Sequence, residues 1–285
     1  MSKKYKVILI GAFGAAVVLI AIALAQWWRG SGQLRVVACD IGQGDAILIQ
    51  TPTHDDILVD GGPDLSVLDC LGRYLPFYDR TIELVVLTHP HADHLVGLVP
   101  VLERYRVERV VFTDVTYSNA AYGEFRRLIA EQQIPAVTAE QGQEWPFGSG
   151  VVVRILYPFS GLSGQSLDNP NNGSIVFQLV YNQVKFLFVG DLEATGETQL
   201  LRTGVDLHSS VLKVGHHGSS TSSIDGFLAA VRPALALISV GQDNKFGHPS
   251  LRVINRLQNM GATVRRTDRD GDVVVWSDGI TAWFK

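Results

Sequence analysis

The chain has few cysteines and no low-complexity region, and each absence excludes a class of protein. Its 285 residues include only two cysteines, Cys39 and Cys70, which form no C-x-x-C pair and are too few for a disulfide-rich scaffold. We expect two thiols in or near the core, with a single disulfide as the alternative outside the cytoplasm. A composition of 18% charged and 46% apolar residues is neither collagen-like nor typical of a disordered chain. It indicates one globular domain of roughly 250 residues plus a short extra segment.

Positive charge is also scarce outside the first 30 residues. Those residues hold four basic and no acidic side chains, which leaves 20 Lys+Arg against 28 Asp+Glu, a formal charge of −8, for the rest. A tight sequence-independent nucleic-acid binder usually shows a basic stripe. This domain shows no obvious basic stripe, although a local basic patch at Arg265-Arg266 or between Arg104 and Arg109 is an alternative. A nucleic-acid substrate would therefore bind weakly and in a salt-dependent manner.

The extra segment is at the start, where an uncharged apolar stretch runs from Val7 to Ala25. Nineteen residues form a helix of about 28 Å, close to the hydrocarbon thickness of a membrane. A membrane anchor is favoured by this length and by Trp27 and Trp28, which suit an interfacial position. A cleaved signal peptide is the alternative, because Ala23-Leu24-Ala25 matches an A-x-A cleavage site.

The flanking charges set the expected orientation of this segment. Three lysines precede it and a single Arg29 follows it, which predicts a cytoplasmic N-terminus. We expect a single-pass cell-membrane protein whose main domain is extracytoplasmic, or a secreted protein if the segment is cleaved. Residues 1–29 then form the anchor or signal sequence, 30–33 a linker and 34–285 the main domain.

Apolar runs alternate with turn residues throughout the domain, and their periodicity predicts strands and helices in both halves. Among the predicted elements are strands at 34–40, 46–50, 57–60, 83–88, 107–113 and 210–214, and helices at 65–75 and 95–105. Further predicted strands include 185–190, 234–240, 263–267 and 272–276. Two halves that each combine strands with helices indicate an α/β fold, an αββα four-layer sandwich with two sheets between outer helices.

Five of the eight histidines lie in two short segments that follow predicted strands, where α/β folds place their sites. The first segment contains His89, His91, Asp93 and His94. So many polar groups cannot all be satisfied in an apolar core. Imidazole nitrogens and carboxylate oxygens are ligands that zinc and similar divalent ions prefer. Four ligands this close suit two ions better than one tetrahedral ion, and a solvated histidine-rich loop is the disfavoured alternative.

Two further segments supply candidate partners. Asp191 follows the predicted strand that ends at Gly190, and taken alone it is more often a helix N-cap. Beside the first segment it is a candidate for a carboxylate that bridges two ions. His216 and His217 follow another strand. Neighbours on a strand point to opposite sides, but at a strand-to-loop transition both could reach the site.

At this point the chain resembles the metallo-β-lactamase-fold hydrolases, whose H-x-H-x-D-H motif matches His89 to His94. More narrowly, it resembles the extracytoplasmic hydrolase domain of the ComEC family of DNA-uptake competence proteins and its stand-alone relatives. The resemblance covers about residues 34–280 and rests on ordered motifs at 40–45, 60–62, 88–97, 172–174, 190–191, 216–219, 244–249 and 266–268.

The resemblance implies a cofactor of two divalent metal ions, zinc or manganese. It assigns His89 and His91 to one ion, Asp93 and His94 to the other, Asp191 as the bridge, and His217 to the second ion. Many members of the superfamily have another histidine ligand in the middle of the chain, and this sequence has none between His94 and Asp191. Either His216 takes the vacant place on the first ion, or that ion has fewer protein ligands.

The implied chemistry is hydrolysis by a hydroxide formed from a water that bridges the two ions. Asp93 is expected to orient this nucleophile, and His248 to protonate the leaving group. A surface-turn role is an equal alternative for His248. Asn172, Ser174 and Ser219 are candidates to donate hydrogen bonds to substrate, although Asn172 could simply shape its loop.

Residues earlier in the chain are candidates to support the histidines from behind. Asp40, Gln43 and Asp45 are candidates to hydrogen-bond to the metal ligands. Asp60, followed by two glycines, is equally well explained as a turn residue.

Three functions compete for this site. The favoured one is a phosphodiesterase or nuclease that acts on DNA or on a phosphorylated envelope polymer, because dinuclear sites suit phosphoryl displacement. The alternatives are a hydrolase of C–N or C–O bonds, such as a β-lactamase-like enzyme, and a metal-binding module without catalysis. The expected partners are the phosphodiester substrate and the membrane, with no obligate protein partner.

Overall fold

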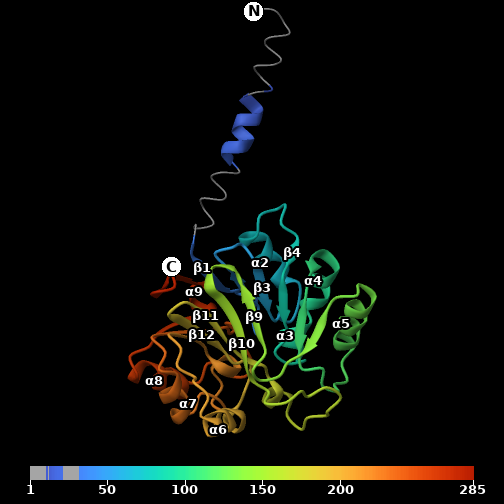
Figure 1. Ribbon diagram of the computed structural model, residues 1–285. Coiled ribbons are helices and arrows are strands. Elements are labelled where there is room, and N and C mark those ends of the chain that lie inside the picture. The colour runs from blue at the N-terminus through green and yellow to red at the C-terminus, as the bar shows by residue number, and fades with distance from the viewer. Residues whose placement is uncertain (1–10, 12, 22–31) are drawn as a thin grey trace, which may run out of the picture.

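Two β-sheets lie face to face with helices over their outer surfaces (Figure 1). The computed structural model describes residues 11, 13–21 and 32–285. The eight-stranded sheet has the spatial order β17 (Ala282–Phe284), β16 (Val273–Ser277), β1 (Leu34–Ala38), β2 (Ile47–Gln50), β3 (Asp56–Val59), β5 (Leu84–Val86), β7 (Val110–Phe112) and β8 (Ala136–Thr138). The seven-stranded sheet has the order β15 (Thr263–Arg266), β14 (Leu235–Ile238), β13 (Val211–Lys213), β12 (Val184–Phe188), β11 (Val176–Tyr181), β10 (Val151–Tyr157) and β9 (Glu144–Phe147). A small separate pair joins β4 (Thr81–Ile82) to β6 (Arg106–Val107).

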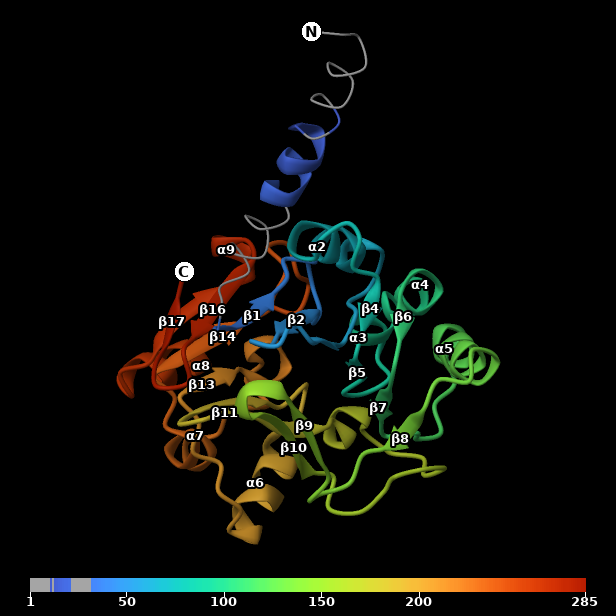
Figure 2. The ribbon, with the colours of Figure 1, turned by 45° about the horizontal axis from the view of Figure 1, so that its top comes forward.

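Each sheet carries its own set of helices, which the two views show on opposite sides of the molecule (Figures 1 and 2). The eight-stranded sheet is covered by α2 (Ser66–Tyr74), α3 (Ala92–Leu95), α4 (Leu98–Arg104) and α5 (Ala120–Glu131). The seven-stranded sheet is covered by α6 (Ala194–Thr203), α7 (Asp225–Val231) and α8 (Leu251–Asn259). Shorter turns complete the description: α9 (Thr267–Asp270), η1 (Gly148–Gly150), η2 (Pro170–Gly173) and η3 (Gly215–Gly218).

Three apolar cores fill the spaces between the four layers. Alternate residues of a strand face opposite sides of a sheet, so Val36 on β1 lies in the core between the sheets, while its neighbour Val37 lies in the core under the first set of helices. In the second sheet, Phe186 and Leu187 divide in the same way between the central core and the core under α6, α7 and α8. This arrangement confirms the predicted αββα sandwich.

Tertiary contacts divide two elements that periodicity predicts as continuous. The predicted helix at 95–105 becomes α3 and α4. The carbonyl of His94 accepts a hydrogen bond from the Gly61 N–H at 2.6 Å, and the Gly97 N–H donates to the Gly62 carbonyl at 3.0 Å. These bonds replace the ones that would continue the helix. The predicted strand at 107–113 divides into β6 and β7, which pair with β4 and β5 in different sheets.

Cys39 and Cys70 form a disulfide that joins the end of β1 to α2, so the prediction of two free thiols is wrong and its alternative is confirmed. Both residues are buried. Closing a loop with a sequence separation of 31 residues stabilises the fold by about 4 kcal/mol if the effect is that of chain entropy.

The prediction of a single-pass membrane anchor is corrected by the structure. Within residues 11, 13–21 and 32–285, no helix has the length and apolar character needed to cross a bilayer. Residues 13–21 are helical, and the remainder of the predicted 7–25 span, except Gly11, lies outside the described residues. The predicted localisation in the cell membrane depended on this span and is withdrawn as well.

Candidate metal centre

The predicted metal ligands come together where parallel strands of both sheets end. His89 follows β5 in the first sheet, Asp191 follows β12 in the second, and His216 and His217 follow β13. The strands β12, β13 and β14 are parallel, as are β3 and β5, so their carboxyl ends meet at one edge. Loops at the carboxyl ends of parallel strands are the usual place for sites in α/β folds.

A single carboxylate oxygen lies at the centre of this cluster. The distance from Asp191 Oδ2 is 3.3 Å to His94 Nε2, 3.5 Å to His217 Nε2, 3.7 Å to His216 Nε2 and 3.9 Å to His89 Nε2. Ligand atoms about 2.1 Å from one tetrahedral ion are about 3.4 Å from each other. The histidines therefore surround Asp191 at separations that suit atoms of shared coordination shells.

The buried polar atoms of the cluster lack partners within the protein. The Nε2 atoms of His89, His94 and His217 and the Oδ1 atom of Asp191 are buried, and none makes a hydrogen bond with a described residue. Leaving such an atom buried and unpaired costs about 1–3 kcal/mol. Four such atoms in one place fit a site for divalent cations, since each presents a free lone pair.

One set of ligands is complete in geometry. Asp93, His94, Asp191 and His217 each offer one ligand atom, and these atoms lie within 4.8 Å of one another. This set is the one predicted for the second ion together with the bridge. His91 lies beside it, with its ring centroid 4.6 Å from that of His89. The structure thus brings all seven predicted ligands to one region, and the division between two ions stays a prediction.

A left-handed turn allows both adjacent histidines to face Asp191. His216 and His217 have φ values of 48° and 52°, in a region that non-glycine residues rarely adopt. The turn η3 thereby directs neighbouring side chains to one side, which an extended strand would not do. The His216 N–H donates to the Gly190 carbonyl at 3.1 Å, which ties the turn to the Asp191 loop.

Two aspartates hold the histidines from behind. Asp60 Oδ2 lies 2.8 Å from His94 Nδ1, and Asp60 accepts hydrogen bonds from the Thr88 N–H and hydroxyl, each at 2.7 Å. Asp45 Oδ1 lies 3.5 Å from His217 Nδ1, which is also 3.0 Å from the Ser239 carbonyl. Partners at Nδ1 orient each ring and leave Nε2 for a metal. Asp60 is therefore more than a turn residue, because it orients the His94 ring.

A buried lysine balances this group of carboxylates. Lys213 is 1% exposed, its Nζ lies 2.8 Å from Asp45 Oδ2, and it donates to the Val214 carbonyl at 2.9 Å. Burial by itself would raise the pKa of Asp45, but the charges of Lys213 and His217 outweigh this effect and lower it. Asp45 is therefore a carboxylate at neutral pH.

The cluster has a strongly negative field. Burial would lower the pKa of His217, but the carboxylates of Asp191 and Asp45 outweigh it and raise this pKa to about 9. The same balance of burial against Asp191 and Asp60 raises the pKa of His94. Such a field stabilises cations, and a metal ion competes with the proton for each ring.

Of the three predicted substrate-binding residues, Ser174 contacts the cluster directly. Ser174 is fully buried, and its Oγ accepts a hydrogen bond from the Asp191 N–H at 3.1 Å. Ser219 Oγ lies 3.0 Å from Thr221 Oγ1 within the histidine turn. Asn172 has a buried Oδ1 without a hydrogen-bond partner among the described residues. Contact of these three residues with substrate stays a prediction.

The other predicted supporting residues lie farther away. The Asp40 N–H donates to Asp272 Oδ1, and Gln43 Oε1 accepts from the Gly241 N–H. Neither is hydrogen-bonded to a cluster histidine within residues 32–285. Lys213 was missed, although its position between Leu212 and Val214 in an apolar strand is a signal, because a lysine in such a run is rarely buried without a partner.

His248 lies at the edge of the cluster. Its ring centroid is 5.5 Å from that of His216, and it is half-buried. Burial and the neighbouring His216 both lower the pKa of His248. On the opposite side, the Tyr117 ring lies 5.8 Å from that of His91.

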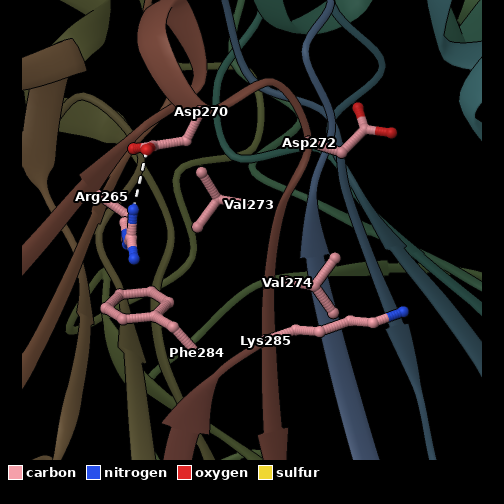
Figure 3. Close-up of a pocket in the computed structure, with 7 residues that line it drawn as sticks. All are labelled: Arg265, Asp270, Asp272, Val273, Val274, Phe284 and Lys285. Carbon is pink, nitrogen blue, oxygen red and sulfur yellow. Dashed lines mark hydrogen bonds and ion pairs between the residues drawn. The ribbon is translucent and has the colours of Figure 1, made fainter.

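A pocket elsewhere in the protein has a different character. Figure 3 shows Arg265, Asp270, Asp272 and Phe284 around a cavity of about 130 Å³, near the last two strands. Small-molecule sites usually measure roughly 300–1,000 Å³. None of the residues that line this cavity belongs to the histidine cluster.

Comparison with known proteins agrees with this geometry. A family model described as the metallo-beta-lactamase superfamily matches residues 39–242. The chain is 28% identical to ComE operon protein 3 of Bacillus subtilis, over 85% of the chain and 33% of that protein. It is 31% identical to competence protein ComA of Neisseria gonorrhoeae, over 83% of the chain and 31% of that protein. The chain thus spans about a third of the length of these curated relatives.

Among solved structures, the fold resembles the metallo-beta-lactamase fold protein YhfI from Bacillus subtilis. The TM-score is 0.56 at 14% identity, and the match covers 88% of this chain and 100% of the other. At this level of identity the likeness concerns the fold.

Proposed function

The chain belongs to the metallo-β-lactamase superfamily, and on that premise we propose that it is a metal-dependent hydrolase of phosphodiester bonds. The observation that carries the proposal is the convergence of four imidazole Nε2 atoms on Asp191 Oδ2, three of them buried without a hydrogen-bond partner among the described residues. The similarity to competence proteins supports a nucleic-acid substrate, and a phosphorylated envelope polymer offers the same chemistry.

The residues of the cluster divide into two ligand sets in this proposal. His89, His91 and His216 would hold one ion, and Asp93, His94 and His217 the other, with Asp191 between them. Zinc and manganese both accept such ligands. When bound, two divalent ions would lower the pKa of a water molecule and withdraw charge from the phosphoryl oxygens.

The chain's own side chains would orient and complete the reaction. The Asp93 side chain is 32% exposed and thus the most accessible of the cluster carboxylates, so it is placed to orient the attacking water. His248 would deliver a proton to the leaving oxygen, because its ring lies beside that of His216 at the edge of the cluster. Because the metal ions would supply both the activated water and the positive charge that faces the phosphodiester, activity should depend strictly on added metal.

The test combines metal analysis with three substrates. The full chain is treated with a chelator, reloaded with zinc or manganese, and assayed with bis-p-nitrophenyl phosphate, linear DNA and a chromogenic cephalosporin. We expect hydrolysis of the phosphodiesters and a loss of more than about 100-fold in the Asp191→Asn variant, which keeps the shape but removes the bridging charge. The control variant is His208→Ala, which removes an exposed histidine outside the cluster.

Three outcomes would contradict the proposal. Hydrolysis of the cephalosporin alone would assign the site to C–N bonds. Full metal occupancy without hydrolysis of any substrate would indicate a metal-binding module. Equal activity of the Asp191→Asn and His208→Ala variants would place the reaction elsewhere.

A further inference from the structure

The loop that follows β14 is held in shape by one asparagine. Asn244 Nδ2 donates to the carbonyls of Gly241 and His248 at 2.8 and 2.7 Å. Its Oδ1 accepts from the N–H groups of His248 and Phe246 at 2.9 and 3.2 Å. The side chain therefore uses all its hydrogen-bonding capacity within residues 241–248, and the loop has a defined conformation.

Both ends of this loop are fixed to loops of the metal centre. At one end, the Gly241 N–H donates to Gln43 Oε1 at 3.2 Å. At the other, the Ser250 N–H donates to the Gly218 carbonyl at 2.9 Å, and a Cβ on Gly218 would lie only 2.5 Å from Pro249 Cβ. Gly218 directly follows His217, so the loop cannot move away from the histidine turn without losing these contacts.

The loop presents an aromatic side chain to solvent beside the metal centre. Phe246 is 68% exposed. Its ring stacks on that of His248, with centroids 5.7 Å apart and planes inclined by 20°. The next ring is that of His216, whose Nε2 lies 3.7 Å from Asp191. A series of rings thus leads from the proposed reaction centre to one exposed aromatic residue.

A flat aromatic group attached to the substrate is the occupant that fits this position. Nucleobases stack on exposed aromatic side chains, and they do so when they are unpaired. In a duplex the bases are stacked on each other, and reaching them requires unstacking. Duplex binding depends instead on many phosphate contacts with a basic surface, and residues 31–285 carry a formal charge of −8. Lys245, exposed beside Phe246, offers a cation to one neighbouring phosphate.

We propose that Phe246, supported by His248, is a stacking platform for an unpaired nucleobase next to the scissile phosphate, so that the preferred substrate is a single-stranded oligonucleotide. This inference rests on the proposed phosphodiesterase function and names the substrate class of the same site. It makes Phe246 a determinant of specificity and assigns it no part in bond cleavage.

The test compares Phe246→Ala and Phe246→Trp with the unsubstituted protein. The substrates are a labelled oligothymidylate, the same oligonucleotide with abasic sugars around the scissile bond, and a blunt duplex. In Phe246→Ala we expect the ratio of kcat/KM for oligothymidylate to that for the abasic strand to fall by about 5- to 150-fold, the loss of one base–aromatic stack. Phe246→Trp should retain the ratio and show quenching of its indole fluorescence on binding. Phe77→Ala, which removes an aromatic residue that is 87% exposed in another loop, is the matched control.

Binding measurements separate failure of this inference from failure of the proposed function. Fluorescence anisotropy of the labelled strands gives affinities for the same variants whether or not cleavage occurs. A chain that cleaves no phosphodiester but binds oligothymidylate more tightly than the abasic strand, with loss in Phe246→Ala, would sink the catalytic proposal and support the platform. Equal ratios and equal affinities in Phe246→Ala and Phe77→Ala, or a preference for the duplex, would overturn the platform.

Discussion

The buried pair of Lys213 and Asp45 should stabilise the fold of the metal centre, and Lys213→Met tests this. The side chains are 1% and 2% exposed and lie 2.8 Å apart. Methionine keeps much of the volume but removes the ammonium group, which leaves the Asp45 carboxylate buried with only His217 and His94 as neighbours of opposite charge among the described residues. Breaking a buried ion pair from one side costs about 3–5 kcal/mol. Because His217 Nδ1 stays 3.5 Å from Asp45 Oδ1, we expect the lower half of this range, about 3–4 kcal/mol.

The assay is urea unfolding of the chelator-treated protein at neutral pH. In thermal unfolding, a loss of about 3–4 kcal/mol in the free energy of unfolding should lower Tm by roughly 6–16 °C in a domain of this length. The matched control is Lys185→Met, because Lys185 and Asp206 lie 2.6 Å apart but with side chains 27% and 65% exposed. An exposed pair contributes only about 0–1 kcal/mol. The two lysines thus differ in burial rather than in the presence of a partner.

A double-mutant cycle shows whether the cost comes from the pair. Lys213→Met combined with Asp45→Asn removes both charges, so its cost should be at least about 2 kcal/mol less than the sum of the single changes. The reasoning fails if Lys213→Met costs no more than Lys185→Met, or if the two single costs simply add.

Two further predictions concern the proton donor and a buried acid outside the cluster. His248→Asn should lower kcat on oligonucleotides by about 10²- to 10⁴-fold without changing the metal content. The loss on bis-p-nitrophenyl phosphate should be smaller, because p-nitrophenolate leaves without a proton. Equal losses on both substrates in steady-state assays would exclude proton donation. Burial raises the pKa of Glu197 from 4.5 to about 7, even though it accepts hydrogen bonds from the Ser223 and Ile224 N–H groups at 2.6 and 2.9 Å. Since the folded state holds this proton more tightly, the contribution to stability is present below pH 4.5 and is lost as the pH rises through about 7, a change of about 3 kcal/mol. Glu197→Gln should remove that part of the pH dependence of the unfolding free energy, and unchanged slopes in urea titrations across this pH range would contradict the assignment.

The sandwich and the convergence of the ligands were predictable because both follow from local patterns. Apolar runs mark the strands, and three of the predicted ligands stand a few residues after one of them: His89 after β5, Asp191 after β12 and His217 after β13. Parallel strands present their carboxyl ends at the same edge. The order of strands and ligands, together with the resemblance to the metallo-β-lactamase-fold hydrolases, was therefore enough to predict that these side chains lie close together.

Asp45 was among the predicted supporting residues, but most of the supporting contacts were not predictable, because they depend on distances between loops that are remote in sequence. Asp60 reaches His94 across 34 residues, and Gln43 reaches Gly241 across 198. The Cys39–Cys70 bond likewise depends on how α2 packs beside β1 and not on cysteine spacing. The anchor prediction rested on the length of an apolar stretch, and the described residues contain no helix long and apolar enough to cross a bilayer.

The absence of a histidine between His94 and Asp191 gains a physical explanation from the turn at His216. Two successive non-glycine residues in a left-handed conformation cost about 1–3 kcal/mol each and persist only where surrounding contacts enforce them. Here the enforcing contacts are a 2.7 Å hydrogen bond from the Ser219 N–H to the His216 carbonyl and one of 2.8 Å from Ser222 Oγ to the Gly215 carbonyl. The left-handed turn places the His216 imidazole 3.7 Å from Asp191. In an extended strand, the His216 side chain would point away from the side that His217 faces. A turn kept at such a cost supports the proposal that His216 is the ligand that compensates for the missing histidine.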